Sequence, residues 1–375
     1  MKIVYISRSI IPSRTANSIN VMKMCNTFAT LGHEVILLAP LTKKLEEVGI
    51  DNFFEYYGVE ENFKLKKVYS PNIKYLKKRI YSFRCLSIVK EIQPDIVYGR
   101  DDMFAFYLTQ KAGFYTLFEK HEPFDNKGFN DYFFKKFVEN SKNMKMIVNS
   151  NELKKMYHNS CSISLNSILA ANNGTNKIPD NKIPDNIKLD NKIQIGYVGS
   201  LFKGRGIDII VNLAKRIPEA NFHIIGGKEK DLEYWKKQAN YSNLIFYGFV
   251  EPKETYKYRN MCDILLAPYQ SDNEGNRSSK YMSPIKLFEY MSSKKVIVCS
   301  NFKVVYEALD ENSAILVDSS NIDEWENAIR ELINNKSKRD ILAQNAYKKF
   351  LENFTWKSRV EKILDFTMEK SDKFN

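Results

Sequence analysis

Short apolar runs alternate with longer segments of helical periodicity along most of the chain. The runs Lys2–Ser7, Glu34–Ala39 and Asp95–Tyr98 are typical of buried strands, and helix-period segments such as Ala16–Leu31 and Met103–Lys111 separate them. Strands that alternate with helices in this way form parallel sheets covered by helices on both faces. The sequence therefore predicts a doubly wound α/β architecture.

A five-residue repeat interrupts this alternation. Asn176-Lys-Ile-Pro-Asp180 recurs as Asn181-Lys-Ile-Pro-Asp185 and, more loosely, over residues 186–190. Because Asn, Pro, Lys and Asp favour turns and bury little apolar surface, the repeat is expected to be a loop. The alternation then restarts, and 375 residues exceed what one hydrophobic core usually serves. We expect an N-terminal domain over residues 1–175, a linker over 176–192, a second domain over 193–354 and a C-terminal helix over 355–375 that crosses back to the first domain.

The chain is strongly basic. It has 57 Lys and Arg against 45 Asp and Glu, a formal net charge of +12. An excess of this size suits a nucleic acid, a membrane surface or an anionic ligand. Residues 64–90 contain nine basic residues and no acidic one, with aromatic residues among them, and residues 132–137 combine aromatics with Lys. This pattern favours peripheral contact with an anionic membrane, and its alternative is a solvated helix face.

Several classes of protein are excluded. No apolar run approaches the roughly 20 residues that a membrane-spanning helix needs, and residues 1–6 are typical of a buried strand rather than a cleavable signal. The five cysteines are far apart, and neither they nor the four histidines have metal-ligand spacing. We expect a cytoplasmic protein, placed at the inner face of the cytoplasmic membrane if its basic surface binds lipid, with no metal site.

The most informative segment spans residues 283–291. Ser283 is a favourable N-cap and Pro284 fits the first helical position, so a helix is expected to begin here. The first N–H groups of such a helix lack intrahelical partners and form an anion site at the positive end of the helix dipole. Those groups belong to Ile285, Lys286 and Leu287. A cation at this end is unfavourable unless an anion binds there, so Lys286 favours a phosphate ligand.

Glu289 lies one helical turn after Lys286, on the same face. A carboxylate in this position is suited to accept hydrogen bonds from two neighbouring hydroxyls, as acidic residues do with the ribose of a nucleotide. The alternative is an ordinary capped helix in which Glu289 pairs with Lys286.

A second candidate anion site follows the strand that ends at Val198. The segment 196–206 is a strand end, a loop with several glycines and two cations, and the start of a helix, a layout that presents N–H groups and charge to phosphate. It contains neither the full GxGxxG of dinucleotide-binding folds nor the GxxxxGK[ST] of P-loop NTPases. Two anion sites after different strands of one domain indicate a nucleotide diphosphate.

With these motifs the chain resembles the retaining glycosyltransferases of the GT-B fold, family four, also called glycosyl transferases group 1. The resemblance covers nearly the whole length and rests on residues 198–206, Tyr247-Gly-Phe-Val250, Asp263–Pro268 and Ser283–Met291. It implies two Rossmann-like domains that face an interdomain cleft. It also implies retaining transfer of a sugar from a UDP- or GDP-linked donor, with no metal or other cofactor. The acceptor would be a glycan or lipid-linked molecule in the synthesis of a cell-surface polysaccharide or glycolipid.

The resemblance also implies roles in the donor site. Arg205 and Lys286 would meet the pyrophosphate, Glu289 matches the second glutamate of the family's Glu-x7-Glu motif, and Tyr247 and Phe249 would border the base. The predicted donor site is completed by Ser200, Lys203, Ser283, Pro284, Ile285 and Leu287. The first glutamate of the motif is replaced by Tyr281. The contact to the donor sugar is then expected from the polar loop Tyr269–Met282, which contains Glu274 and Lys280, or from the Ser283 region.

In the N-terminal half the resemblance points to His121, just past a strand end, as the second catalytic residue beside Glu289. Its alternative is an ordinary histidine in a surface loop. Asn17 and Ser18 occupy the loop where relatives carry glycines, and Arg100 ends another strand. We expect Asn17, Ser18 and Arg100 on the acceptor side.

Two other functions stay open from the sequence. A sugar-nucleotide epimerase or phosphorylase of the GT-B fold would share the sheets, although the 283–291 segment argues against it. A basic nucleic-acid-binding protein would need a groove-reading element or a stacking sheet, and the sequence offers neither.

Overall fold

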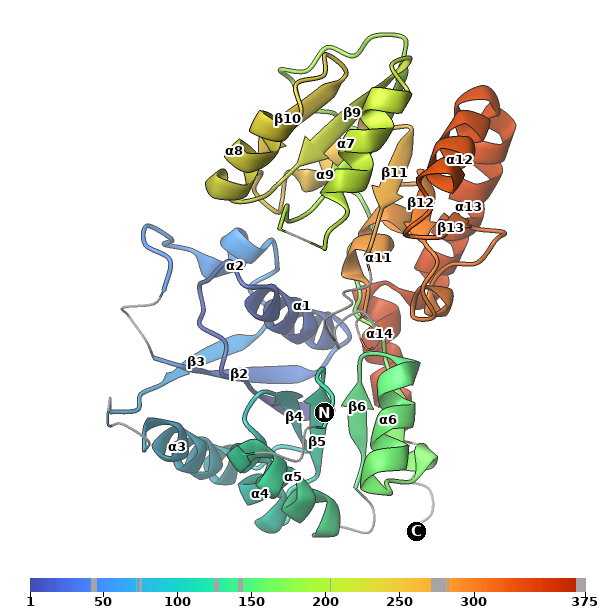
Figure 1. Ribbon diagram of the computed structural model, residues 1–375. Helices are drawn as coiled ribbons and strands as arrows, with labels where there is room; N and C mark the ends of the chain where they lie inside the picture. The colour runs from blue at the N-terminus through green and yellow to red at the C-terminus, as the bar shows by residue number, and fades with distance from the viewer. Residues whose placement is uncertain are drawn as a thin grey trace. The chain divides into compact units, whose positions relative to one another are not determined.

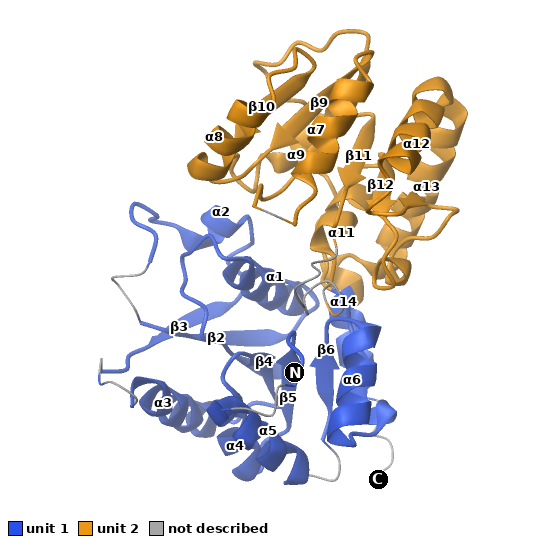
Figure 2. Ribbon diagram, in the orientation of Figure 1, with its two compact units in different colours: residues 1–172, 359–375 blue, residues 173–358 orange. Residues whose placement is uncertain are grey.

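The computed structural model describes residues 1–41, 46–71, 73, 76–124, 128–140, 144–202, 204–270, 281 and 283–368. These residues form two compact units, which Figure 2 shows in different colours. Unit 1 comprises residues 1–172 and 359–375, and unit 2 comprises residues 173–358. Each unit is built on its own parallel sheet, so the predicted α/β class with two doubly wound domains is confirmed.

The sheet of unit 1 has seven strands in the order β3-β2-β1-β4-β5-β6-β7. In chain order the strands are β1 (Lys2–Ile6), β2 (Glu34–Pro40), β3 (Lys64–Val68), β4 (Ile96–Arg100), β5 (Thr116–Lys120), β6 (Met146–Val148) and β7 (Ile168–Ala170). All neighbouring pairs are parallel. The inner strands are almost fully buried, which agrees with their continuous apolar sequences.

Helices cover both faces of this sheet. They are α1 (Ala16–Thr30), α2 (Phe53–Tyr57), α3 (Lys77–Ile92), α4 (Met103–Lys111), α5 (Gly128–Glu139), α6 (Asn151–Cys161) and most of α14 (Trp356–Met368). Figure 1 shows α1 on one face and α3, α4 and α5 on the other. Short polar side chains begin several of these helices: Thr15 accepts a hydrogen bond from Ser18 N–H, and Asp102 accepts one from Ala105 N–H.

The sheet of unit 2 has six parallel strands in the order β10-β9-β8-β11-β12-β13. The strands are β8 (Ile193–Val198), β9 (Ala220–Ile225), β10 (Leu244–Gly248), β11 (Ile264–Ala267), β12 (Val296–Ser300) and β13 (Ile315–Val317). The helices are α7 (Ile207–Arg216), α8 (Glu229–Gln238), α9 (Thr255–Asn260), α11 (Ile285–Ser292), α12 (Ile322–Asn334) and α13 (Lys336–Asn353).

Both faces of the unit 2 sheet are buried. Ile264 and Leu266 of β11 belong to one cluster of buried apolar residues, whereas Leu265 and Ala267 belong to another. Because successive side chains of a strand point to opposite faces, these two clusters lie on opposite sides of the sheet. Apolar packing on both faces therefore stabilises the sheet, and the loops at the ends of its strands start from fixed positions.

The boundary between the units differs from the predicted one. The chain passes from unit 1 to unit 2 after residue 172 and returns at residue 359. The repeat has neither helix nor strand, as expected, but it belongs to unit 2 and is not a linker between domains. The reason is that it packs: Asn260 donates hydrogen bonds of 3.0 Å to the carbonyl oxygens of Asp180 and Lys182, and Ile187 lies against a buried cluster.

Candidate functional site

The strand order of each sheet reverses at one point, and many of the predicted site residues lie near it. In unit 2 the reversal lies between β8 and β11, and in unit 1 it lies between β1 and β4. The loops that follow two such strands leave in opposite directions, and ligands of α/β sheets bind at the carboxyl ends of the strands beside this opening. Both units therefore offer a candidate site, which we describe separately.

In unit 2 the loop after β8 lies tightly against its neighbours. Gly206 has a φ of +75°, and a Cβ at this position would collide with the carbonyl oxygen of Pro268, which follows β11. A Cβ at Gly199 would lie 2.9 Å from Lys286 Nζ. Glycine is thus required at Gly206 and leaves room for the lysine at Gly199. The loop after β8, the end of β11 and the first turn of α11 meet at one place.

Lys286 is the central cation of this place. Its Nζ lies 3.8 Å from the centre of the Tyr197 ring and 5.6 Å from that of Tyr269, a cation–π arrangement. Among the described residues it forms neither a hydrogen bond nor an ion pair. Burial, together with the nearby Arg205 guanidinium, lowers the pKa of Lys286 to about 7. Such a group gains a full charge when an anion arrives.

Arg205 is the second cation. Its guanidinium lies over the ring of Phe202, 4.5 Å from the ring centre. Its Nε is buried and, within the part of the chain that the structure describes, has no hydrogen-bond partner. Neither Lys286 nor Arg205 forms an ion pair with a described residue, although the nearby Glu289 carboxylate partly offsets the charge of Lys286. The two cations repel each other, and a bound anion would remove that repulsion.

The start of α11 differs from the prediction. The helix begins at Ile285 with Pro284 as its N-cap, and no side chain caps it. The Ser283 hydroxyl instead accepts a hydrogen bond of 3.0 Å from Asn173 N–H, so Ser283 is not the N-cap. Ile285 N–H donates to the Ser283 carbonyl and Leu287 N–H to the Pro284 carbonyl. Of the three N–H groups expected to be free, only that of Lys286 lacks a partner among the described residues.

Glu289 pairs with a residue that the sequence did not indicate. Its carboxylate lies 3.8 Å from Nη1 of the buried Arg259, which also donates to the hydroxyls of Ser293 and Thr255. The alternative in which Glu289 pairs with Lys286 is therefore wrong. About one third of the Glu289 side chain is exposed, so its carboxylate stays open to a ligand. No motif surrounds Arg259, so this partner could not be predicted from the sequence.

The residues predicted to border the base lie at the end of β10. Tyr247 occupies an irregularity in the pairing of β10 with β9, and its hydroxyl is 2.9 Å from Nδ1 of the buried His223. Burial lowers the pKa of His223 to about 4, so the imidazole is neutral at pH 7. Phe249, two residues later, is 58% exposed.

Two other donor-site predictions involve the loops. The carbonyl of Ser200 accepts a hydrogen bond of 2.7 Å from the Tyr197 hydroxyl, which fixes the loop after β8. Lys203 lies outside the described residues, and so does most of the loop before Tyr281, including Glu274 and Lys280.

In unit 1 three of the predicted residues come together at the carboxyl ends of β4 and β5. Arg100 Nη1 lies 2.6 Å from His121 Nδ1, and Asn17 donates a hydrogen bond of 2.6 Å to Asp101, the residue after β4. Ser18 is fully buried, and its hydroxyl donates to the carbonyl oxygens of Ser13 and Thr15 at the start of α1. Ser18 therefore shapes the loop and offers no side chain to a ligand.

Glu119, which the sequence did not single out, lies beneath this group. The carboxylate is buried and contacts His121 Nε2, the Tyr98 hydroxyl and, at 2.7 Å, Arg359 Nη2 of α14. The Arg359 guanidinium first, and then the hydrogen-bonded His121, hold the pKa of Glu119 well below its usual range despite burial. Burial and Arg100 lower the pKa of His121, so this imidazole is neutral at pH 7.

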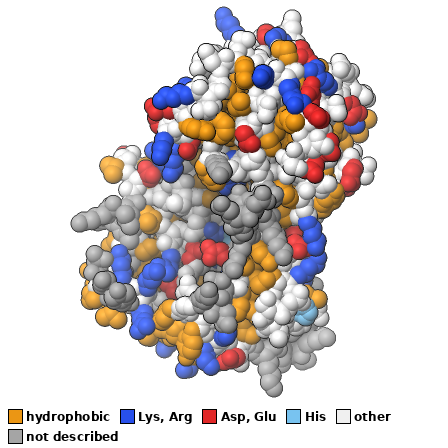
Figure 3. Space-filling model, in the orientation of Figure 1, with side chains coloured by type: hydrophobic (Ala, Val, Ile, Leu, Met, Phe, Trp, Pro, Cys, Tyr) orange, Lys and Arg blue, Asp and Glu red, His pale blue; other side chains and the backbone are white. Residues whose placement is uncertain are grey.

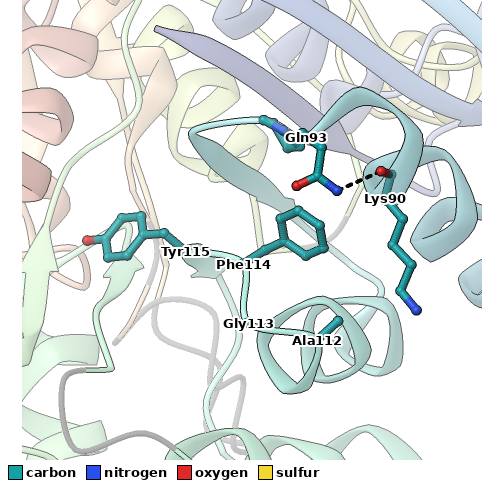
Figure 4. A pocket seen from close by; sticks show the side chains of 7 residues that line it. Lys90, Gln93, Ala112, Gly113, Phe114 and Tyr115 are labelled. Atoms are coloured by element: carbon teal, nitrogen blue, oxygen red, sulfur yellow. Dashed lines mark hydrogen bonds between the residues drawn. The ribbon is translucent and has the colours of Figure 1, made fainter.

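A separate pocket of about 420 Å³ opens at the other edge of the unit 1 sheet (Figure 4). It is lined by the residues that precede β4 and β5, among them Gln93, whose amide donates to the Lys90 carbonyl at 2.7 Å. It contains none of the predicted site residues, and ligands of parallel sheets bind at the opposite edge. We therefore do not assign it to the candidate site.

The described residues contain neither a metal-binding cluster nor a helix that could span a membrane. No group of three or more His, Cys, Asp or Glu is arranged to hold a metal ion. In the same residues, no helix is both long enough and apolar enough to cross a bilayer.

Comparison with known proteins identifies a family for part of the chain. Residues 180–349 match the model of the family described as glycosyl transferases group 1. An uncharacterized glycosyltransferase of Methanocaldococcus jannaschii is 32% identical over 182 residues, which are 46% of this chain and 44% of that protein. The aligned segments span less than half the length of the curated relatives.

Solved structures match over almost the whole chain. HepE of Anabaena, in complex with UDP and glucose, superposes with a TM-score of 0.71 at 13% identity, covering 98% of this chain and all of that one. The lipopolysaccharide outer core galactosyltransferase WaaB superposes with a TM-score of 0.70 at 16% identity, covering 99% and 100%. These matches agree with the resemblance found in the sequence in two respects, the group 1 family over residues 180–349 and the fold over the whole chain. Residues 180–349 carry the glycosyl transferases group 1 domain, and the two units have the GT-B fold.

Proposed function

We propose that the protein is a retaining glycosyltransferase that uses a nucleotide diphosphate sugar. The observation that carries this proposal is the pair of cations at the end of β8: Lys286 and Arg205 share one opening with no acidic partner among the described residues. A diphosphate supplies the negative charge that this opening lacks. The complex of HepE with UDP and glucose supports the same class of donor.

Each residue then has a defined task. Lys286 and Arg205 stabilise the charge that develops on the leaving diphosphate, with the Lys286 N–H as a further donor, in the position where other transferases use a metal ion. Glu289, held by Arg259, accepts from the ribose hydroxyls, and Phe249 stacks on the base of a UDP- or GDP-linked sugar. Retention proceeds here without the paired carboxylates of retaining glycosidases.

We assign the acceptor to the Arg100–His121–Asn17 group of unit 1. The acceptor we propose is a glycan or a lipid-linked molecule on the way to a cell-surface polysaccharide or glycolipid. WaaB, a lipopolysaccharide galactosyltransferase of the same fold, supports this direction.

An exposed aromatic and basic surface on unit 1 supports contact with a membrane. We call it the α3–α5 patch: Phe83, Phe104, Phe129, Tyr132 and Phe133, which touch in series, with Arg79 over the ring of Phe129. The three helices hold eight Lys and Arg and three acidic residues, of which Asp131 is buried. Figure 3 shows orange and blue side chains next to one another on this lower part of the molecule. Aromatic rings among cations suit an anionic lipid surface at the cytoplasmic face.

Liposomes test the membrane contact. Arg79→Glu with Lys135→Glu should reduce sedimentation with phosphatidylglycerol vesicles, because each cation near such a surface contributes roughly 1 kcal/mol. Lys348→Glu, the same change on an exposed side chain of α13 in unit 2, is the control. Equal loss with both variants, or equal binding to neutral vesicles, would contradict the patch.

A thermal-shift screen with UDP, GDP and their sugars, without added metal, tests the donor. A ligand at 100 times its Kd stabilises the folded state by about 2.7 kcal/mol. We expect one nucleotide series to stabilise the protein, and product analysis with that sugar nucleotide should show transfer with retained anomeric configuration. If no nucleotide stabilises the protein at millimolar concentration, the proposal fails, and formation of an epimerised sugar nucleotide would replace it with an epimerase.

A further inference from the structure

A continuous chain of polar contacts crosses unit 1 from its last helix to its first. Arg359 of α14 contacts Glu119 at the end of β5, Glu119 contacts His121, and His121 contacts Arg100 at the end of β4. Arg100 then lies 3.7 Å from Asp101, which accepts from Asn17 of α1. Glu119 and Arg359 are both about 1% exposed, so the charged end of this chain is buried in the protein.

The chemistry of the partners fixes the proton of His121. An ionised carboxylate only accepts hydrogen bonds, so His121 Nε2, which contacts Glu119, must carry the proton. Arg100 Nη1 lies 2.6 Å from His121 Nδ1 and 3.2 Å from Nε2. A guanidinium only donates, and Nε2 already carries the proton that faces Glu119, so Nδ1 is the ring nitrogen whose lone pair is left for Arg100. The ring is therefore the neutral Nε2–H tautomer, with both nitrogens engaged inside the protein.

This arrangement leaves the free donors on Arg100. Its Nη1 donates to His121, whereas no acceptor is found for its Nη2 in the described part of the chain. Arg359 cannot take this role because its Nη1 donates to the carbonyl oxygens of Ala171 and Asn172 and its Nη2 to Glu119. Burying Glu119 and Arg359 costs desolvation, and this cost is offset only while every partner stays in place.

We propose that Glu119, held by Arg359, is a positioning residue that fixes His121 in the Nε2–H tautomer, and that His121 thereby orients the Arg100 guanidinium at the carboxyl edge of the unit 1 sheet. Arg100, rather than His121, is then the side chain offered to a ligand. The tautomer is independent of the proposed function, whereas the use of Arg100 for the acceptor rests on it.

Nitrogen NMR of protein labelled with 15N-histidine tests the tautomer directly, without nucleotide or acceptor. The chain has four histidines, and His121→Gln identifies the His121 signals. At pH 7 we expect a protonated Nε2 and an unprotonated Nδ1. A protonated Nδ1, or an imidazolium at this pH, would overturn the proposal and leave the donor assignment in unit 2 untouched.

Two variants separate positioning from a merely structural role. The charged groups that face His121 are Arg100 from β4, Glu119 from β5 and Arg359 from α14. Removing a cation in Arg100→Met should raise the pKa of His121, and removing the anion in Glu119→Gln should lower it. Lys90→Met, an exposed cation at the other edge of the sheet, should leave this pKa unchanged.

Shifts in opposite directions would support the proposal, whereas shifts in the same direction, or none, would overturn it. Arg100 lies at the sheet edge, so Arg100→Met provides a test even if Glu119→Gln fails to fold. In that variant the Nδ1 signal should also move toward that of a free ring nitrogen, because its donor is gone.

Discussion

Both units carry charged groups near the carboxyl ends of their strands and treat them in opposite ways. In unit 1 the buried carboxylate of Glu119 is compensated within the protein, by Arg359 and by the imidazole of His121. In unit 2 the cations Lys286 and Arg205 face aromatic rings and have no acidic partner among the described residues. The charges at the carboxyl edge of the unit 1 sheet are thus compensated by other groups of the protein, whereas those in unit 2 are not.

This difference indicates which unit depends on a ligand for its charge balance. A buried ion pair that is complete holds its neighbours in place, and losing one partner is costly. A buried lysine without an anion is destabilising, and its lowered pKa expresses that cost. The unit 1 site is therefore shaped before any ligand binds, whereas the unit 2 site gains stability when an anion arrives.

The largest effect is expected when the ion pair of unit 1 is removed. Arg359→Met leaves Glu119 buried without its main partner and should reduce stability toward urea by about 3–5 kcal/mol. Nucleotide binding to unit 2 should persist below the unfolding transition. Lys362→Met, an exposed change on the same helix, is the control. If the two variants are equally stable, the ion pair between Arg359 and Glu119 does not stabilise unit 1.

A weaker effect is expected when a cation of unit 2 is removed, and it should change ligand binding and not stability. Lys286→Met should weaken nucleotide binding by about 10- to 100-fold, the loss of a charge-assisted contact, without lowering the stability of the free protein. Isothermal titration and urea unfolding measure the two quantities. Lys294→Met is a matched control because Lys294 also lies over a ring, 4.4 Å from the centre of Tyr347. If Lys286→Met lowers the stability of the ligand-free protein, the proposed difference between the two units is wrong.

The smallest effect concerns pH. With a pKa of about 7, Lys286 loses its proton as the pH rises, so a sugar nucleotide, whose diphosphate does not titrate here, should bind about fivefold more weakly at pH 8 than at pH 7. Below pH 6 the affinity should level off because the lysine is already charged. Lys286→Met should abolish this dependence, and a pH profile that the variant keeps would assign it to another group.

Much of the fold could be predicted because short-range sequence patterns specify its strands and helices. The apolar runs at β1, β2, β4 and β8 and the helical periods between them specify two parallel sheets. The edge strand β3 was not predicted because its sequence, Lys64-Leu-Lys-Lys-Val68, has no apolar run. Its basic residues were interpreted as part of an exposed surface instead. Its stability comes from pairing with β2, which no local pattern shows.

The site was only partly predictable for the same reason. Lys286 and Glu289 were found because they stand three residues apart in one motif. The partner of Glu289, Arg259, lies 30 residues earlier, and the partner of Glu119 lies 240 residues later. The cap of α11 was misjudged because Ser283 has a competing donor, Asn173, which is distant in sequence. Pairings of this kind are set by the fold and have no local signal.

The return of α14 to unit 1 has a consequence for biosynthesis. A ribosome makes residues 173–358 before it reaches Arg359, so the whole of unit 2 emerges while Glu119 still lacks its main partner. Domains generally fold in the order in which they are made, but here the first sheet is completed by the last helix. The Glu119–His121–Arg100 group of unit 1 should therefore mature only after α14 has been made, and a nascent chain that stalls inside unit 2 would carry an unfinished first unit.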